Sequence, residues 1–211
     1  MSGAIVELEL PDGTRMSVPG GSTALDVARR IGAGLAKAAL AAEIGGELID
    51  LRAPLPARGG RIRIITARDP EGGQVIRHSA EHVMADAVKR LWPATQIDVG
   101  RSDHTEKFQY DFDLPVRTTP DALPKSAAEI RKIGAEDAAC GRGVVDRAEA
   151  KRIFEELGET LKVSRLDDIP AGQDITIFRH GGFVDLCRGP HVQRAGQIGA
   201  WRLTELAGSY W

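Results

Sequence analysis

The chain has 211 residues, of which 42% are hydrophobic, so it is long enough to bury one core or two smaller ones. Its formal net charge of −2 excludes a strongly basic overall surface, although a local basic patch could still contact nucleic acid. No segment approaches the about 18 consecutive apolar residues of a membrane span. The beginning "MSGAIVELELPDG" has the pattern of a strand and not of a signal peptide. We expect Cys140 and Cys187 to be free thiols in a reducing compartment, which favours a cytoplasmic protein.

Residues 1–66 predict a small domain that begins with a β-hairpin. "AIVELEL" alternates apolar and polar residues and "PDGT" is a turn signal, so the next few residues are predicted to return as a partner strand. Ser22 or Thr23 can cap a short helix over "TALDVARRIG" that ends at Gly32. "LAKAALAAEIGGELIDL" predicts another short helix and a strand pair, and "GGRIRIIT" predicts a closing strand. This order predicts a β-grasp (ubiquitin-like) fold.

Residues 67–211 predict a larger α+β domain. Asp69 and Pro70 favour the start of a helix that continues to about Leu91, weakened by two glycines in its first turn. Two further helices are expected over residues 120–139 and 148–157. Strands are expected in "TQIDVG", "KFQYDFDL", "GVVDR", "TLKVSRL", "DITIFRH", "FVDLC" and "AWRLTELAG". The sheet is therefore expected to be mostly antiparallel.

The predicted helix "VIRHSAEHVMADAVKRLWP" carries two histidines four residues apart, His78 and His82. A spacing of four residues places both on one side of a helix. The opposite side carries the apolar residues Ala80, Val83, Met84, Ala87, Val88 and Leu91. A single histidine is more often a surface residue or a satisfied core residue, but two histidines away from the apolar stripe are typical of a metal site or a hydrolytic site.

A second motif, "FVDLCRGPHV", contains Cys187 and His191 with the spacing C-x-x-x-H. Glycine and proline between them favour a sharp turn, which can direct both side chains to one point. Together with the two helical histidines they could ligate Zn²⁺ tetrahedrally, or surround a substrate carbonyl as acid, base and hydrogen-bond donors. Cys187 alone could equally be a small buried apolar residue. The residues themselves leave these alternatives open.

"HSAEH" also fits H-x-x-E-H, a zinc-peptidase motif in which the glutamate is the catalytic base. Such a peptidase needs a carboxylate ligand further along the chain, and the pair of Cys187 and His191 is not that signature. Glu81 is therefore expected to lie at the flank of the histidine side without a catalytic role, and a zinc peptidase is a distant alternative.

Five segments together resemble the N-terminal half of bacterial threonyl-tRNA synthetases: "RHSAEHVMADAVKRLWP", "FQYDFD", "ELGETLKVS", "FVDLCRGPHV" and "LTELAGSYW". Residues 1–66 resemble the TGS domain, which is a β-grasp module. Residues 67–211 resemble the tRNA-editing (second additional) domain that alanyl-tRNA synthetases share. The resemblance implies hydrolysis of the ester bond in tRNA(Thr) mischarged with serine, with tRNA(Thr) as partner and no membrane partner. A non-catalytic tRNA-binding or regulatory module is the alternative.

The resemblance also implies a set of site residues. The family's editing residues fall on His78, His82, Tyr110, Lys162, Asp185, Cys187 and His191. His78 and Lys162 are expected to position and activate water, and the other two histidines are expected to shape the pocket. Cys187 is expected to belong to the same catalytic group. Asp185 is expected to bind the α-ammonium group of the substrate, and Tyr110 its side chain or ribose.

Alanyl-tRNA synthetases carry zinc at the equivalent positions, so the candidate zinc set is His78, His82, Cys187 and His191. We nevertheless expect editing without a metal, because Lys162 and Asp185 supply charges that zinc would otherwise provide. ATP and a further zinc ion are expected to belong to an aminoacylation core that would follow Trp211. Family members dimerise through that core, so a monomer is expected.

Two regions depart from the family pattern. "RSD" at residues 101–103 replaces the usual Gly-Pro, and "KFQYD" at residues 107–111 replaces Gly-Phe-Tyr-Tyr-Asp. Glycines lie in and after the predicted helix over residues 120–139, where each would cost about 1 kcal/mol if helical. These glycines are Gly134, Gly141 and Gly143.

Overall fold

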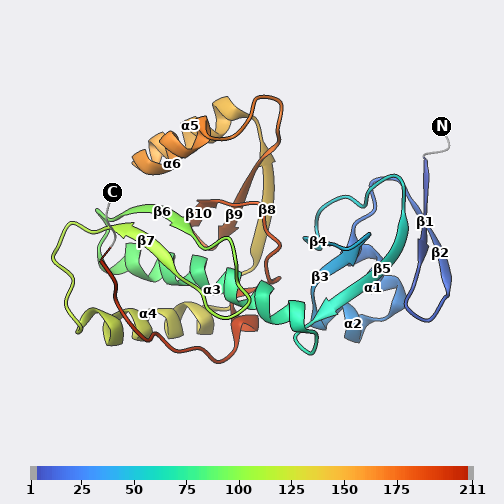
Figure 1. Cartoon of the computed structure of the whole chain (residues 1–211), viewed down its shortest axis with the longest axis horizontal. Helices are drawn as coiled ribbons and strands as arrows, with labels where there is room; N and C mark the ends of the chain where they lie inside the picture. Colours follow the sequence, from blue (N-terminus) through green and yellow to red (C-terminus); the bar gives the residue numbers. More distant parts are fainter. Residues whose placement is uncertain (1–3, 209–211) are drawn as a thin grey trace. The chain divides into compact units, whose positions relative to one another are not determined.

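The computed structural model describes residues 4–208, which form two compact units (Figure 1). The first unit runs to Ile76 and includes the segment Gly189–Gln193, and the second unit comprises the rest of the chain. Within the described residues, no helix is long and apolar enough to cross a membrane.

The first unit is a five-stranded sheet with two short helices. Its elements are β1 (Ile5–Glu9), β2 (Arg15–Pro19), α1 (Ala24–Ile31), α2 (Ala33–Ala38), β3 (Ala39–Ile44), β4 (Glu47–Ile49) and β5 (Gly60–Thr66). The strand order is β2-β1-β5-β3-β4, in which β1 runs antiparallel to β2 and parallel to β5. The predicted β-grasp fold is confirmed.

Two local signals in this unit act as the sequence predicts. The Gly13 N–H closes the β1–β2 turn by donating to the Leu10 carbonyl at 2.9 Å, and Gly13 has the positive φ of 84° that favours glycine. Helix α1 begins with a capping box. Thr23 Oγ1 accepts from the Asp26 N–H at 3.2 Å, and the Asp26 carboxylate accepts from the Thr23 N–H at 2.9 Å. These contacts fix the direction in which α1 covers the sheet.

Helix α3 (Pro70–Leu91) begins at the predicted proline and ends at the predicted leucine. The glycines in its first turn do more than weaken it. A Cβ on Gly72 would lie 2.0 Å from the Thr66 carbonyl oxygen at the end of β5, so the close approach of helix and strand requires glycine there. The carboxylate of Asp69 accepts from the Thr66 N–H at 2.7 Å and tightens the same turn.

The second unit combines two antiparallel sheets with helices, as the predicted α+β class requires. Its further elements are β6 (Gln96–Gly100), β7 (Tyr110–Asp113), α4 (Ala122–Glu136), β8 (Cys140–Val145), α5 (Arg147–Glu156), α6 (Thr160–Asp167), β9 (Ile175–His180), β10 (Phe183–Leu186) and the 3-10 helix η1 (Ala195–Ile198). One sheet has the order β10-β9-β8, and the other pairs β6 with β7. One apolar core of this unit contains Ala150, Ile153, Phe154, Leu166, Ile175 and Ile177.

Two predicted strands are wrong. Residues 160–166 form helix α6, in which Lys162 and Leu166 are both buried and lie one helical turn apart. A segment of seven residues is too short for its apolar pattern to distinguish a strand, with a period of two, from a helix, with a period of 3.6. The packing of Leu166 against α5 and β9 favours the helix. Residues 200–208 have no regular structure and are mostly exposed. The last three residues of the "AGSYW" motif lie outside the described residues.

The three glycines singled out in the sequence differ in their surroundings. Gly134 lies within α4, whereas Gly141 and Gly143 lie within β8. A helical cost therefore applies only to Gly134. At Gly143 a Cβ would lie 3.0 Å from the Ile177 side chain, so the β8–β9 pair favours a small residue.

Candidate active site

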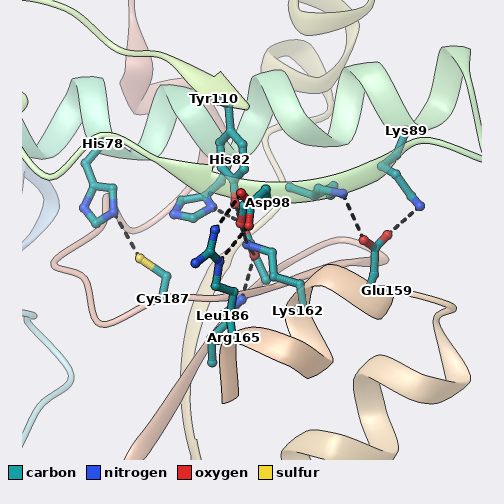
Figure 2. A network of polar contacts seen from close by, with 12 residues as sticks. His78, His82, Lys89, Asp98, Tyr110, Glu159, Lys162, Arg165, Leu186 and Cys187 are labelled. Atoms are coloured by element: carbon teal, nitrogen blue, oxygen red, sulfur yellow. Dashed lines mark hydrogen bonds and ion pairs between the residues drawn. The ribbon is translucent and has the colours of Figure 1, made fainter. Parts of the chain in front are cut away.

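The second unit contains a cleft of about 370 Å³, which is within the size range of small-molecule sites. Its walls come from α3, β6, β7, α6 and the end of β10 (Figure 2). Five of the residues predicted from the sequence line it: His78, His82, Tyr110, Lys162 and Cys187.

The two helical histidines lie on the same side of α3, as predicted, with ring centroids 5.3 Å apart. The prediction that this side lies away from the interior is wrong for His82, which is 3% exposed and stacks on Phe178 of β9 at 4.5 Å between centroids. His78 is half-buried. The polar side of the helix can enter the interior because its members have polar partners there, which offsets the cost of burial.

Asp185 on β10 is the centre of a buried polar network and is 0% exposed. Its Oδ1 lies 2.6 Å from Lys162 Nζ and accepts from the Leu186 N–H at 2.7 Å. Its Oδ2 accepts from the Tyr110 hydroxyl and lies 2.9 Å from His82 Nδ1. Four donors therefore occupy both oxygens. The α-ammonium contact expected for Asp185 does not fit this burial, because a substrate would have to displace internal partners.

The network shifts the pKa values of its members. Burial alone would raise the pKa of Asp185, but Lys162 and His82 hold it far below its usual range. Burial alone would lower the pKa of His82, but Cys187 and Asp185 raise it. Burial and the neighbouring Asp185 raise the pKa of Tyr110 well above its ordinary value. At neutral pH Asp185 is therefore ionised, and Tyr110 is a neutral hydrogen-bond donor.

Lys162 was predicted on a strand but lies in the first turn of α6. Its Nζ donates to the Asp98 carbonyl at 2.6 Å and to the Tyr110 hydroxyl oxygen at 2.8 Å, and it pairs with Asp185. An ammonium group has three donors, and these partners use all three. Lys162 is also only 3% exposed. The expected role of Lys162 in activating water therefore does not fit its geometry.

The start of α6 is fixed to β6 by side chains that the sequence did not single out. Gln96 Oε1 accepts from the Thr160 N–H at 2.8 Å. Glu159 Oε2 accepts from the Ile97 N–H at 3.1 Å, and its Oε1 lies 2.5 Å from Lys89 Nζ. These contacts position the helix that carries the site lysine (Figure 2).

Cys187 follows β10, and its Sγ lies 3.0 Å from His78 Nε2. With His82 these residues form a candidate metal-binding His/Cys cluster, since their donor atoms all lie within 4.8 Å of one another. His191, the fourth member of the predicted zinc set, belongs to the segment that groups with the first unit. Within that unit its N–H donates to Asp50 Oδ2 at 3.2 Å.

Glu81 has a structural role that the sequence analysis did not predict. It is 1% exposed, and its Oε1 accepts from the N–H groups of Arg101 at 3.2 Å and Gln109 at 3.0 Å. The carboxylate thus ties both ends of the loop over residues 101–109 to α3. Gly100 makes room for it, because a Cβ there would lie 2.2 Å from Glu81 Oε2. The sequence offered no signal for this contact, because the helical pattern placed this side of α3 away from the apolar core.

Asp98 and Arg165 form a second unpredicted pair. Arg165 Nε and Nη2 donate to Asp98 Oδ1 and Oδ2 at 2.8 and 2.9 Å, a two-point contact to a carboxylate that is 2% exposed. The sequence signal for this pair was the aspartate within the predicted strand "TQIDVG", because a carboxylate that is buried in a strand needs a cationic partner.

Two family models match the chain. The TGS domain matches residues 6–66, and the threonyl and alanyl tRNA synthetase second additional domain matches residues 175–209. Threonine–tRNA ligase of Acidiphilium cryptum is 47% identical over 205 residues, which are 97% of this chain and 32% of that protein. The enzyme of Symbiobacterium thermophilum is 44% identical over 99% of this chain and 32% of its own length. That of Geobacillus kaustophilus is 42% identical over 98% of this chain and 31% of its own length.

The two matches place a TGS domain before a segment that matches the threonyl and alanyl tRNA synthetase second additional domain. More particularly, the chain is similar over almost its whole length to threonine–tRNA ligases, and it spans about a third of the length of these relatives. The resemblance identified from the sequence motifs is confirmed.

Proposed function

We propose that this chain hydrolyses the ester bond of tRNA(Thr) mischarged with serine and serves a threonine–tRNA ligase in proofreading. The observation that carries the proposal is the cleft in which half-buried His78 contacts Cys187 beside the buried network of Asp185. This arrangement combines a proton acceptor with a fixed polar wall. The similarity to threonine–tRNA ligases and the editing-associated domain support the choice of substrate.

The need for a second site follows from the size of the two amino acids. Serine lacks only the methyl group of threonine, and one such group gives roughly 10–200-fold discrimination at a first binding site. Hydrolysis in a cleft that admits serine and excludes the larger side chain would correct the remaining errors.

We assign the attacking water to His78. An imidazole can accept a proton from water as the oxygen attacks the ester carbonyl, and it can return that proton to the ribose oxygen when the ester bond breaks. His78 suits this role because it is half-buried and lines the cleft. His82 and Cys187 lie beside it, where they would contact the reacting ester.

We assign Lys162, Tyr110 and Asp185 to positioning, in place of the direct roles expected from the family. Their polar atoms are directed at one another, and their contacts hold His82 through its Nδ1. Lys162 and Tyr110 also line the cleft, but their polar atoms are bound to internal partners, so we expect them to act on a substrate through His82. Loss of any of the three would act through the orientation and the charge of that imidazole.

We further propose that hydrolysis needs no metal in the His78–His82–Cys187 cluster. Lys162 already places a cation 2.6 Å from the carboxylate that holds His82, and this cation would repel another one nearby. A zinc ion, if bound there, would supply a polarised water. Undiminished deacylation after treatment with a chelator would support metal independence, and loss of deacylation that zinc restores would contradict it.

The direct test is deacylation of seryl-tRNA(Thr) and threonyl-tRNA(Thr) by the chain as it stands. We expect hydrolysis of the seryl ester alone, and a decrease of about 10²–10⁴-fold in His78→Ala, the size of a general acid–base contribution. Lys107→Ala removes an exposed charge of the 101–109 loop and should retain the parent rate. Equal hydrolysis of both esters, or full activity of His78→Ala, would reject the proposal.

The same assay separates the alternatives. A non-catalytic module would bind tRNA(Thr) and hydrolyse neither ester, and the TGS domain is the feature that favours it. A zinc peptidase would use Glu81 as base, but two backbone N–H groups occupy one of its oxygens. We expect the chain to act as a monomer in the cytoplasm, as the sequence suggests.

A further inference from the structure

We propose that His78, Glu81 and His104 form a binding site for a divalent transition metal, with Zn²⁺ as the best match. The donor atoms of these residues all lie within 4.8 Å of one another. Two imidazoles and one carboxylate are a common ligand set for zinc. The site shares His78 with the His/Cys cluster, so the deacylation proposed above is expected of the metal-free chain.

The three ligands come from one turn of α3 and from the loop between β6 and β7. His78 and Glu81 are three residues apart and therefore neighbours on the helix surface. His104 stacks on His78 with ring centroids 4.5 Å apart, and its Nε2 lies 3.0 Å from Glu81 Oε2. Ligand atoms of a tetrahedral zinc site are about 3.3 Å apart, so side-chain shifts of about 1 Å would complete the geometry.

The surroundings hold two of the ligands in place. Glu81 Oε1 accepts from two backbone N–H groups, which leaves Oε2 on the side of His104. Arg77 donates to the carbonyls of His104 and Thr105 and so fixes the loop that carries the second imidazole. Such outer contacts orient metal ligands and raise affinity.

His104 provides the observation that points to a ligand. Its Nε2 is buried but makes no hydrogen bond, because its approach to Glu81 Oε2 lacks suitable geometry. Buried polar atoms without a partner are rare in folded proteins, and a metal ion bound beside Glu81 Oε2 would satisfy the His104 nitrogen.

The test is titration of the chelator-treated chain with Co²⁺, which reports its ligands in its absorption spectrum. We expect one Co²⁺ per chain, displaced by Zn²⁺, without the thiolate-to-cobalt charge-transfer band that Cys187 would give. His104→Gln should weaken Co²⁺ binding at least about tenfold, since losing a ligand costs no less than losing an outer contact. Cys187→Ser and the exposed control Glu106→Gln should bind Co²⁺ as the parent does.

The variant His104→Cys controls for the possibility that His104→Gln loses Co²⁺ binding only because the loop is disturbed. It replaces one ligand with another, so we expect it to bind Co²⁺ and to acquire the charge-transfer band. The proposal is overturned if the parent takes up no Co²⁺, if its spectrum shows a thiolate band that Cys187→Ser removes, or if His104→Gln binds equally well. It is also overturned if His104→Cys binds without that band. None of these measurements involves tRNA, so the deacylase proposal stands or falls separately.

Discussion

Lys162 Nζ lies 2.6 Å from Asp185 Oδ1, and the two side chains are 4% and 0% exposed. A buried pair of this kind leaves an uncompensated charge when one partner is removed, which costs about 3–5 kcal/mol. We therefore predict that Asp185→Asn lowers the free energy of unfolding by that amount in urea denaturation at neutral pH. Asp113→Asn, an exposed aspartate on β7, should change it by less than about 0.5 kcal/mol.

A double-mutant cycle refines this prediction. Lys162→Met combined with Asp185→Asn removes both charges, so the combined loss should be clearly smaller than the sum of the two single losses. Additive losses would show that the two residues act independently, contrary to the network around Asp185.

The buried His180 is predicted to make the fold sensitive to acid. It is 1% exposed, and burial, together with Arg90 and His82, lowers its pKa from 6.5 to about 4. Because the folded value lies below the unfolded one, His180 contributes stability that is present above about pH 6.5 and lost as the pH falls through about 4. Urea denaturation across this range should show the decline.

His180→Phe isolates this contribution. Neither ring nitrogen of His180 makes a hydrogen bond, and its ring contacts Phe178 and Phe183. The variant should match the stability of the parent at neutral pH and lose less of it in acid. An unchanged acid decline would mean that another group titrates there, such as Asp86, whose Oδ2 lies 3.4 Å from His180 Nε2.

Two glycine substitutions are predicted to have opposite effects. In Gly100→Ala the new Cβ would lie 2.2 Å from Glu81 Oε2, so the carboxylate must move and the loss should be about 1–3 kcal/mol. In Gly134→Ala the Cβ meets nothing within 4 Å inside α4, so the helix should gain about 0.5–1 kcal/mol. Thermal unfolding of both variants gives the sign directly, and equal shifts would refute the steric account.

Gln96 is predicted to stabilise the first turn of α6. Gln96→Ala removes the acceptor of the Thr160 N–H at 2.8 Å and the donor to the Gly158 carbonyl at 2.9 Å, at a cost of about 1 kcal/mol each. Amide hydrogen exchange should accelerate in the first turn of α6 and remain unchanged in α4. Uniform acceleration in both helices would instead indicate global destabilisation.

Local signals in the sequence predicted most of the fold. The proline at the start of α3, the capping box of Thr23 and the turn at Gly13 act through neighbours in the chain and are visible without the structure. The helix over residues 160–167 was missed because its packing against α5 and β9 decides its form. The histidines, Tyr110, Lys162 and Cys187 were found because family motifs mark them.

The contacts of the site residues were less predictable than their identities. Glu81 holds the 101–109 loop because it accepts from an N–H group 20 residues further along the chain. Lys162 has no donor left for water because residues more than 50 positions away accept its hydrogen bonds. The number of hydrogen bonds that a side chain can still make depends on its partners in the folded domain. Neighbouring residues in the sequence do not reveal those partners.

The partners of Asp185 are separated from it by up to 103 residues along the chain. Contacts between such distant positions form late, because closing a long loop costs entropy before any contact offsets it. A nascent chain in which β10 has not yet left the ribosome has two histidines and a lysine but no assembled wall behind them. The proposed hydrolysis should therefore appear in a single step at the end of domain folding, without a partly active intermediate.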